Sequence, residues 1–278
     1  MIAIDGAIVA DELATISVLD RGFLYGDGLF EVLRTWRGVA VDLERHLDRL
    51  TASAAALELA IDRVTLAATV RELLACTTGD QRIRIAVTRG PGGPAMRLGA
   101  GAGGHTIIYA EPLLASPREV SAVFVDYPLA RRTHGHKTLA YLDHLIAKEL
   151  AAAAGADEAI RLGPDGDVVE GATSNLFIVR GDICTPPLTG ILPGITRGHV
   201  LACCNALGLA ASEQRLTIDH FRQADEIFAT SAVRGVVAIT RLDGVARTHG
   251  IGPVTQKLAE AYAARMTRAT MQFSRDGS

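Results

Sequence analysis

Lys137 is the residue whose surroundings first suggest covalent chemistry. It lies between a polar cluster, residues 131–136, and the apolar residues 138–142, where we expect a helix to begin. Partial burial at such a place would lower the pKa of the side-chain ammonium toward the neutral amine that attacks an aldehyde. A solvated lysine at a helix start is the ordinary alternative, and this residue taken alone favours that alternative.

Glu170 is a second candidate, placed after two valines and before Gly171 and a run of small polar residues. A carboxylate buried in such a segment needs a partner, and the protonated ring nitrogen of a bound cofactor would serve. An acid that ends a strand and caps a turn explains the same segment equally well.

A third pattern could bind an anion. Gly194, Ile195 and Thr196 come at the expected start of a helix, where backbone N–H groups and the helix dipole favour a phosphate. Arg49, on an expected helix with His46, could add a bidentate cation. Each residue also has a simpler interpretation: Thr196 as an ordinary N-cap and Arg49 as a solvated helix residue.

Composition excludes several classes of protein. The chain has 278 residues, 49% hydrophobic and 21% charged, as in an ordinary globular protein. Its net charge of −3 and its dispersed basic residues give no reason to expect nucleic acid or membrane partners. The N-terminus does not resemble a signal peptide, and no apolar run is long enough to span a bilayer. The four cysteines lack metal-ligand spacing, so we expect reduced thiols in a cytoplasmic protein without a metal.

The elements that must position these residues follow from apolar periodicity. The expected strands cover residues 29–36, 82–89, 105–110, 121–126, 158–162, 168–169 and 175–179. The expected helices cover residues 44–59, 64–76, 139–154 and 193–208, with a last helix around 254–266. The mixture predicts an α+β protein of two domains. Residues 1–112 form the small N-terminal domain, 113–118 the proline-marked linker, and 119–278 the larger C-terminal domain that carries Lys137.

Beyond these single residues, the chain resembles the fold type IV, or class IV, aminotransferases that depend on pyridoxal phosphate. This group contains branched-chain aminotransferases, D-amino-acid transaminases and aminodeoxychorismate lyases. The resemblance runs nearly from end to end, on several ordered motifs at compatible spacings. The motifs cover residues 20–32, 46–50, 137–142, 155–159, 170–177, 192–197 and 225–228.

This resemblance implies roles for the residues that bind the cofactor, pyridoxal 5'-phosphate. Lys137 would be the Schiff-base lysine and the catalytic proton carrier, and Glu170 would pair with the ring nitrogen. Arg49, with Ile195 and Thr196, would bind the phosphate.

The resemblance also implies a substrate pocket and an assembly. Tyr141 would contact the phenolic oxygen of the cofactor, while Tyr25 and Phe30 match positions that line the pocket of branched-chain enzymes. The implied fold is that of D-amino-acid aminotransferases, two α+β domains with the cofactor at the domain boundary. The implied assembly is a homodimer whose partner chain contributes pocket residues.

One departure from the family pattern concerns the phosphate. By alignment, Ala232 stands where aminotransferases typically carry a threonine that helps to hold phosphate. Ser231 or Thr230 could donate instead, or a backbone N–H group could suffice. A small residue at this place is similar to the pattern of aminodeoxychorismate lyases.

A second departure concerns the substrate carboxylate. Residues 88–97 match only loosely the loop that supplies an arginine and a histidine for this purpose in D-amino-acid transaminases. Phe30 also replaces a tyrosine of those enzymes. The remaining candidates are basic residues near these motifs: Arg97, Arg131, Arg132, His134 and His136.

We therefore expect an aminotransferase that works by a ping-pong mechanism on small molecules. The donor would be an amino acid, of the branched-chain or D-amino-acid type, or an amine, and the acceptor a 2-keto acid. The alternative within the family is aminodeoxychorismate lyase, which eliminates pyruvate to give 4-aminobenzoate. A non-catalytic binding relative ranks below both, because only the threonine at position 232 is missing from the expected cofactor residues.

Overall fold

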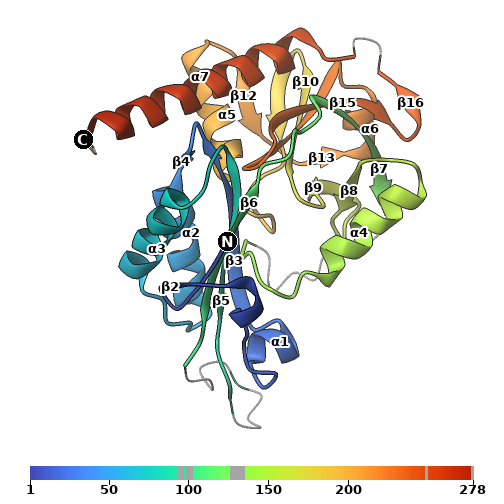
Figure 1. Ribbon diagram of the computed structural model, residues 1–278. Coiled ribbons are helices and arrows are strands. Elements are labelled where there is room, and N and C mark those ends of the chain that lie inside the picture. The colour runs from blue at the N-terminus through green and yellow to red at the C-terminus, as the bar shows by residue number, and fades with distance from the viewer. Residues whose placement is uncertain (93–96, 98–102, 126–134, 248–249, 277–278) are drawn as a thin grey trace. The chain divides into compact units, whose positions relative to one another are not determined.

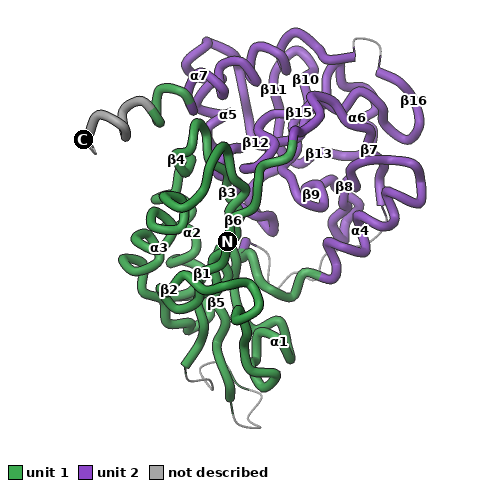
Figure 2. The backbone as a smooth tube through the Cα atoms, viewed as in Figure 1, with its two compact units in different colours: residues 1–114, 136–141, 267–278 green, residues 115–135, 142–266 purple. Residues whose placement is uncertain are grey.

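The computed structural model describes residues 1–92, 97, 103–125, 135–247 and 250–276. The chain divides into two compact units, which Figure 2 distinguishes by colour. Unit 1 comprises Met1–Leu114, His136–Tyr141 and Thr267–Ser278, and unit 2 comprises Ala115–Gly135 and Leu142–Met266. Each unit combines helices with a sheet, so the expected α+β class is confirmed.

Unit 1 is built on an antiparallel sheet with the strand order β2-β1-β6-β5-β3-β4. Its strands are β1 (Ile2–Ile4), β2 (Ala7–Val9), β3 (Gly28–Trp36), β4 (Val39–Ala40), β5 (Gln81–Thr88) and β6 (Thr106–Pro112). Its helical segments are η1 (Asp11–Leu13), α1 (Arg21–Tyr25), α2 (Leu43–Ala56) and α3 (Arg63–Ala75).

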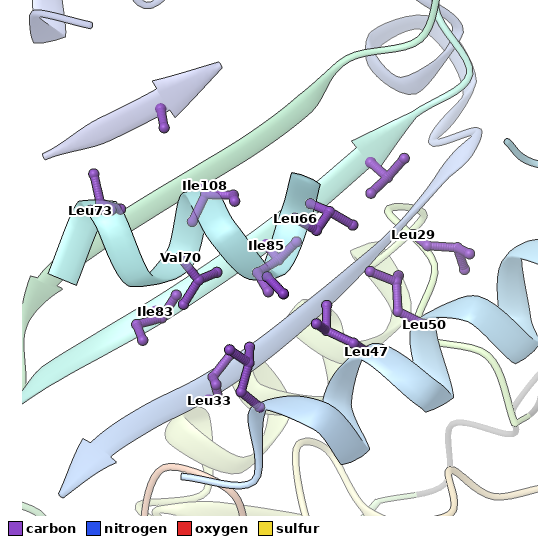
Figure 3. Packing of buried hydrophobic residues seen from close by; sticks show 14 of the residues in the cluster. Leu29, Leu33, Leu47, Leu50, Leu66, Val70, Leu73, Ile83, Ile85 and Ile108 are labelled. Carbon is purple, nitrogen blue, oxygen red and sulfur yellow. The ribbon is translucent and has the colours of Figure 1, made fainter. Parts of the chain in front are cut away.

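One face of this sheet packs against α2 and α3 (Figure 3). Along β5, buried and half-buried residues alternate because successive side chains point to opposite faces of a strand. The buried side chains of the sheet pack against the apolar faces of α2 and α3. Residues in this core include Leu33, Leu47, Leu50, Leu66, Val70, Leu73, Ile83 and Ile85. Asp62 begins α3 by accepting hydrogen bonds from the backbone N–H groups of Val64 and Thr65.

The described part of unit 2 contains a ten-stranded mixed sheet (Figure 1). Its main path runs β12-β11-β10-β14-β15-β7-β8-β9-β13, and β16 pairs with β15. The strands are β7 (Glu119–Val125), β8 (Glu158–Leu162), β9 (Asp167–Gly171), β10 (Asn175–Arg180), β11 (Asp182–Thr185), β12 (Ala211–Glu213), β13 (Leu216–Thr217), β14 (Glu226–Ser231), β15 (Gly235–Leu242) and β16 (Val245–Ala246). The helices are α4 (Leu142–Ala153), α5 (Ile195–Ala206), α6 (Ile218–Arg222) and α7 (Pro253–Asp276), and the residues of α7 from Thr267 onward belong to unit 1.

The interior strand β10 is buried on both faces. Phe177 stacks on Phe228, with ring centroids 4.8 Å apart, in a cluster with residues of α5 and α7. The neighbouring Leu176 and Ile178 point the other way and pack with Phe221 of α6. The continuous apolar run of this strand therefore reflects packing on two sides.

The segment that carries Lys137 belongs to unit 1, whereas the sequence pattern assigned it to the C-terminal domain. The backbone N–H of Phe30 donates to the carbonyl of Lys137 at 2.8 Å, and the N–H of Leu139 donates to the carbonyl of Gly28 at 3.0 Å. Extended pairing with β3 therefore occupies the place where a helix was expected. The expected helix start at residue 139 is wrong, since α4 begins at Leu142.

The glycines of the first motif make this pairing sterically possible. A Cβ on Gly28 would lie 2.6 Å from the Leu139 side chain and 2.4 Å from the carbonyl oxygen of Val87. Gly26 has φ +67°, and a Cβ there would lie 2.8 Å from the backbone of Ala140.

No helix within the described ranges is long and apolar enough to cross a membrane.

Candidate active site

In unit 1, the amine of Lys137 lies against two aromatic rings. Its Nζ is 4.4 Å from the ring centroid of Phe30 and 5.3 Å from that of Tyr141. The two rings meet edge to face with centroids 5.0 Å apart. Phe30 is buried and Tyr141 is half-buried. The arrangement holds a primary amine on a largely apolar wall, where contact with water is limited.

Arg84 contacts the same ring, and the sequence reasoning missed it. Its guanidinium carbon is 3.8 Å from the ring centroid of Phe30. Partial burial lowers the pKa of Arg84, and Tyr109 and Tyr141 oppose that effect, yet an arginine remains charged. Alternation along β5 was the available signal, because it puts Arg84 on the face opposite the isoleucines of the core.

Glu31 and Arg49 form a buried ion pair in unit 1. Arg49 donates from Nε to Oε1 of Glu31 at 2.7 Å and from Nη2 to Oε2 at 2.6 Å, while Nδ1 of His46 lies 2.8 Å from Oε2. Burial by itself would raise the pKa of Glu31, but Arg49 and His46 outweigh it and lower the pKa to about 2. The bidentate contact fixes the plane of the guanidinium that the sequence proposed as a phosphate ligand.

In unit 2, Glu170 ends up in a buried position on β9. The backbone N–H of Leu192 donates to its Oε2 at 3.2 Å. The fully buried Arg161 of β8 is its direct neighbour in the strand register, and sequence reasoning missed this arginine too. Buried acids are stabilised by such donors and cations. Glu170 is therefore a buried acid that a backbone donor holds in place, with an arginine beside it in the sheet.

The start of α5 has the features of an anion cradle. Gly194 is the N-cap, and no side chain caps the first turn. A Cβ on Gly194 would lie 1.9 Å from Oδ1 of Asn175, whose Nδ2 donates to the Leu192 carbonyl at 3.0 Å. Thr196 in the first turn is buried, with its hydroxyl 3.4 Å from that of Tyr262. Uncapped N–H groups, a hydroxyl and a close-packed glycine fit a phosphate group.

The segment around Ala232 has a different set of hydroxyls. Thr230 lies opposite Asn175 in the strand register, so both side chains point to the same face. The hydroxyl of Thr230 is buried without a hydrogen-bond partner among the described residues. Ser231 accepts a hydrogen bond from the backbone N–H of Arg234 at 3.3 Å and thereby closes the turn before β15.

The remaining candidates are dispersed. Tyr25 is exposed on α1, with the guanidinium of Arg21 over its ring, and Arg97 is exposed. His136 is half-buried, with Nδ1 3.0 Å from the hydroxyl of Ser53. Three candidates lie outside the described residues: Arg131, Arg132 and His134.

Comparison with known sequences gives a consistent result. The family described as amino-transferase class IV matches residues 28–242. A putative branched-chain-amino-acid aminotransferase of Methanocaldococcus jannaschii is 35% identical and is aligned over 94% of this chain and 94% of its own. A D-alanine aminotransferase of Bacillus licheniformis is 33% identical, over 92% of this chain and 94% of its own.

Solved structures agree with these relatives. The branched-chain aminotransferase of Thermoproteus uzoniensis, solved with norvaline, has a TM-score of 0.88 and 32% identity, and covers 95% of this chain and 94% of its own. A T.th. branched-chain amino acid aminotransferase, solved with pyridoxamine 5'-phosphate, has a TM-score of 0.88 and 27% identity, over 96% and 93% of the two chains.

Gly194→Ala tests the anion cradle. The new Cβ would displace Asn175 and the loop before α5, so we expect affinity for inorganic phosphate and for pyridoxal phosphate to fall by about tenfold or more. Titration followed by calorimetry measures both. Gly198→Ala, on the same helix with open space at its Cβ, is the matched control and should bind as the parent protein does. If Gly194→Ala binds phosphate and pyridoxal phosphate with the parent affinity, the start of α5 is not the phosphate site.

Glu31→Gln tests the buried ion pair. At pH 7 we expect a loss of about 3–5 kcal/mol in the free energy of unfolding, because Arg49 is left without its carboxylate. The lowered pKa of Glu31 means that this stabilisation is complete above about pH 4.5 and is lost as the pH falls through about 2. Urea unfolding of parent and variant should therefore differ most at neutral pH and converge in acid. Asp48→Asn, at an exposed position of α2, is the control. If the difference in the free energy of unfolding between the parent protein and Glu31→Gln grows as the pH falls, the ion pair does not stabilise the fold as described.

Proposed function

Because the chain belongs to the class IV aminotransferases, we propose that Lys137 is its catalytic lysine and Glu170 the partner of the cofactor ring nitrogen. The family resemblance drawn from the sequence motifs is confirmed, and so is aminotransferase activity as the expected function. The lyase alternative is not favoured, since the matched relatives are named as aminotransferases.

The cofactor is pyridoxal phosphate, whose protonated ring withdraws electrons from the carbon that loses a proton during transamination. A structural relative was solved with pyridoxamine 5'-phosphate, the amino form of this cofactor. Lys137 would hold the cofactor covalently through Nζ. Thr196 and the N–H groups at the start of α5 would hold the phosphate, with Arg49 as an added cation.

The position of the Lys137 amine carries this proposal. Its Nζ lies on the rings of Phe30 and Tyr141, which limit its contact with water and its range of side-chain conformations. A neutral amine in that place can take a proton from the Cα of an amino acid and return it at another carbon. The carboxylate of Glu170, held by the Leu192 N–H, would pair with the ring nitrogen of the bound cofactor and favour its protonated form.

We propose Arg84 as the residue that binds the substrate carboxylate. Among the candidates from the sequence, Arg97 is exposed and His136 is beside Ser53. Arg84 instead contacts the same Phe30 ring as the lysine amine, at 3.8 Å against 4.4 Å from the ring centroid, so its cation would lie near the proposed reacting atoms. A planar guanidinium binds a carboxylate with two parallel hydrogen bonds. The substrate class is a 2-amino acid of the branched-chain or D-amino-acid type, with a 2-keto acid as acceptor.

We also propose a cytoplasmic homodimer. All four cysteines are free thiols, which suits a reducing compartment. Residues 13–25 carry several exposed apolar side chains, a feature that marks interaction surfaces. They include Leu13, Val18, Leu19 and Phe23, which are between 63% and 69% exposed. A second copy of the chain would remove them from water.

Lys137→Ala should abolish transamination while leaving the fold intact. We expect a loss of about 10³-fold or more in kcat, because both the covalent attachment and the proton carrier disappear. The assay measures amino transfer to 2-ketoglutarate from a panel of L- and D-amino acids. Lys257→Ala, at an exposed position of α7, should keep the parent rate. A Lys137→Ala enzyme with near-parent turnover would refute the assignment.

Arg84→Leu should raise the KM for the amino acid by about 10- to 100-fold, because the buried carboxylate loses its charged partner. Affinity for pyridoxal phosphate should change little. Arg82→Leu is the control on the same strand and face, since Arg82 pairs with Glu111. Equal KM values in the parent and Arg84→Leu would assign the substrate carboxylate to another residue.

A further inference from the structure

We infer that the ion pair between the buried Glu158 and the half-buried Arg234 is a positioning pair for the phosphate site of unit 2. It fixes the turn of residues 231–234, so that backbone N–H groups of this turn replace the threonine side chain that is missing at Ala232. The inference rests on the proposed function, because the ligand is the phosphate of the cofactor.

Glu158 lies at the start of β8 with no exposed surface. Nη2 of Arg234 donates to its Oε2 at 2.6 Å, and the hydroxyl of Ser174 lies 3.4 Å from the same oxygen. Nζ of Lys148 is 3.9 Å from Oε1. A carboxylate taken fully out of water is costly unless cations and donors surround it. The pair therefore differs in kind from the exposed ion pairs of this unit.

Through this carboxylate, two turns are tied together. Ser174 belongs to the turn that directly follows Glu170, where the N–H of Gly171 donates to the Ser174 carbonyl at 2.7 Å. A Cβ on Gly171 would lie 2.2 Å from the Ser174 hydroxyl, so this turn is tightly packed. Arg234 belongs to the turn between β14 and β15. Glu158 thus links the residue that is proposed to hold the ring nitrogen with the turn that contains Ala232.

The second turn is anchored at three points. The Ser231 side chain accepts a hydrogen bond from the Arg234 N–H, and the Arg234 side chain donates to Glu158. Gly235, at φ +72°, packs against the ring of Tyr262, because a Cβ at this position would lie 3.2 Å from that ring. A backbone N–H is a good anion donor only where its position is fixed. Alanine at position 232 supplies no donor from its side chain, so the anchoring has to come from elsewhere in the turn.

A purely structural role makes a different prediction. An ion pair that only stabilises unit 2 would, when broken, lower the free energy of unfolding without changing how the protein distinguishes pyridoxal phosphate from pyridoxal. A positioning role changes that ratio, because only pyridoxal phosphate carries the group that the turn binds.

The experiment measures the affinity of the full-length protein for pyridoxal phosphate and for pyridoxal. We expect Arg234→Met to weaken binding of pyridoxal phosphate by about 10- to 100-fold and of pyridoxal by less than about twofold. Arg234→Lys, which keeps the charge, should recover part of the loss. Adding Glu158→Gln to Arg234→Met should cause little further loss, since both changes break one contact.

Arg222→Met is the matched control, because it removes an exposed ion pair with Asp243 in the same unit. It should leave both affinities unchanged. The inference is overturned if Arg234→Met lowers stability but keeps the parent ratio of the two affinities. If Glu158→Gln fails to fold, the Arg234 variants still decide the matter, since that side chain is 20% exposed. A parent protein that binds no pyridoxal phosphate would overturn the proposed function as well.

Discussion

The backbone pairing between β3 and the segment that carries Lys137 is the constraint on which the proposed catalytic arrangement of unit 1 depends. Two hydrogen bonds, from Phe30 to Lys137 and from Leu139 to Gly28, fix the lysine backbone in an extended conformation. The pairing requires close approach of two chain segments, which only a glycine at position 28 permits. The proposed catalytic amine is thus positioned by main-chain geometry, and its side chain lies against the rings of Phe30 and Tyr141.

Buried carboxylates provide the second layer of order. Glu31 holds Arg49, Glu158 holds Arg234, and Glu226 accepts from the backbone N–H groups of Val254 and Thr255 at the start of α7. Each carboxylate loses water when the chain folds, so each must be given a cation or several donors in return. The partners are in every case parts of a helix or turn, and the pairing therefore sets the place of that element within its unit.

The proposed phosphate and substrate contacts suggest how one family can vary its donors. The relatives include enzymes named for branched-chain amino acids and for D-alanine. In this chain the side chain at position 232 has no donor, while the neighbouring turn is tied down by Arg234 and the hydroxyl of Thr230 is buried without a partner among the described residues. On the substrate side, Arg84 shares the Phe30 ring with the lysine. These local differences, on a common scaffold, are where substrate preference would be adjusted.

The elements and the chemical types at the site could be predicted from the amino-acid order alone. The strand Glu158–Leu162 was predicted with its observed bounds, and the helices of unit 1 within a few residues, because periodicity of apolar residues reports local conformation and the buried face. The family motifs also singled out Lys137 and Glu170 as candidates, although each residue taken alone has an ordinary structural explanation. The meeting of distant residues, in contrast, became visible only in the folded chain. There Lys137 precedes its helix on a segment paired with β3, Arg84 contacts Phe30, and Arg234 reaches Glu158. Such contacts join residues far apart in the chain, and a single sequence contains no periodic signal for them. Local sequence fixes the conformation of a segment and the face it buries, whereas the partner on that face depends on how all segments pack together.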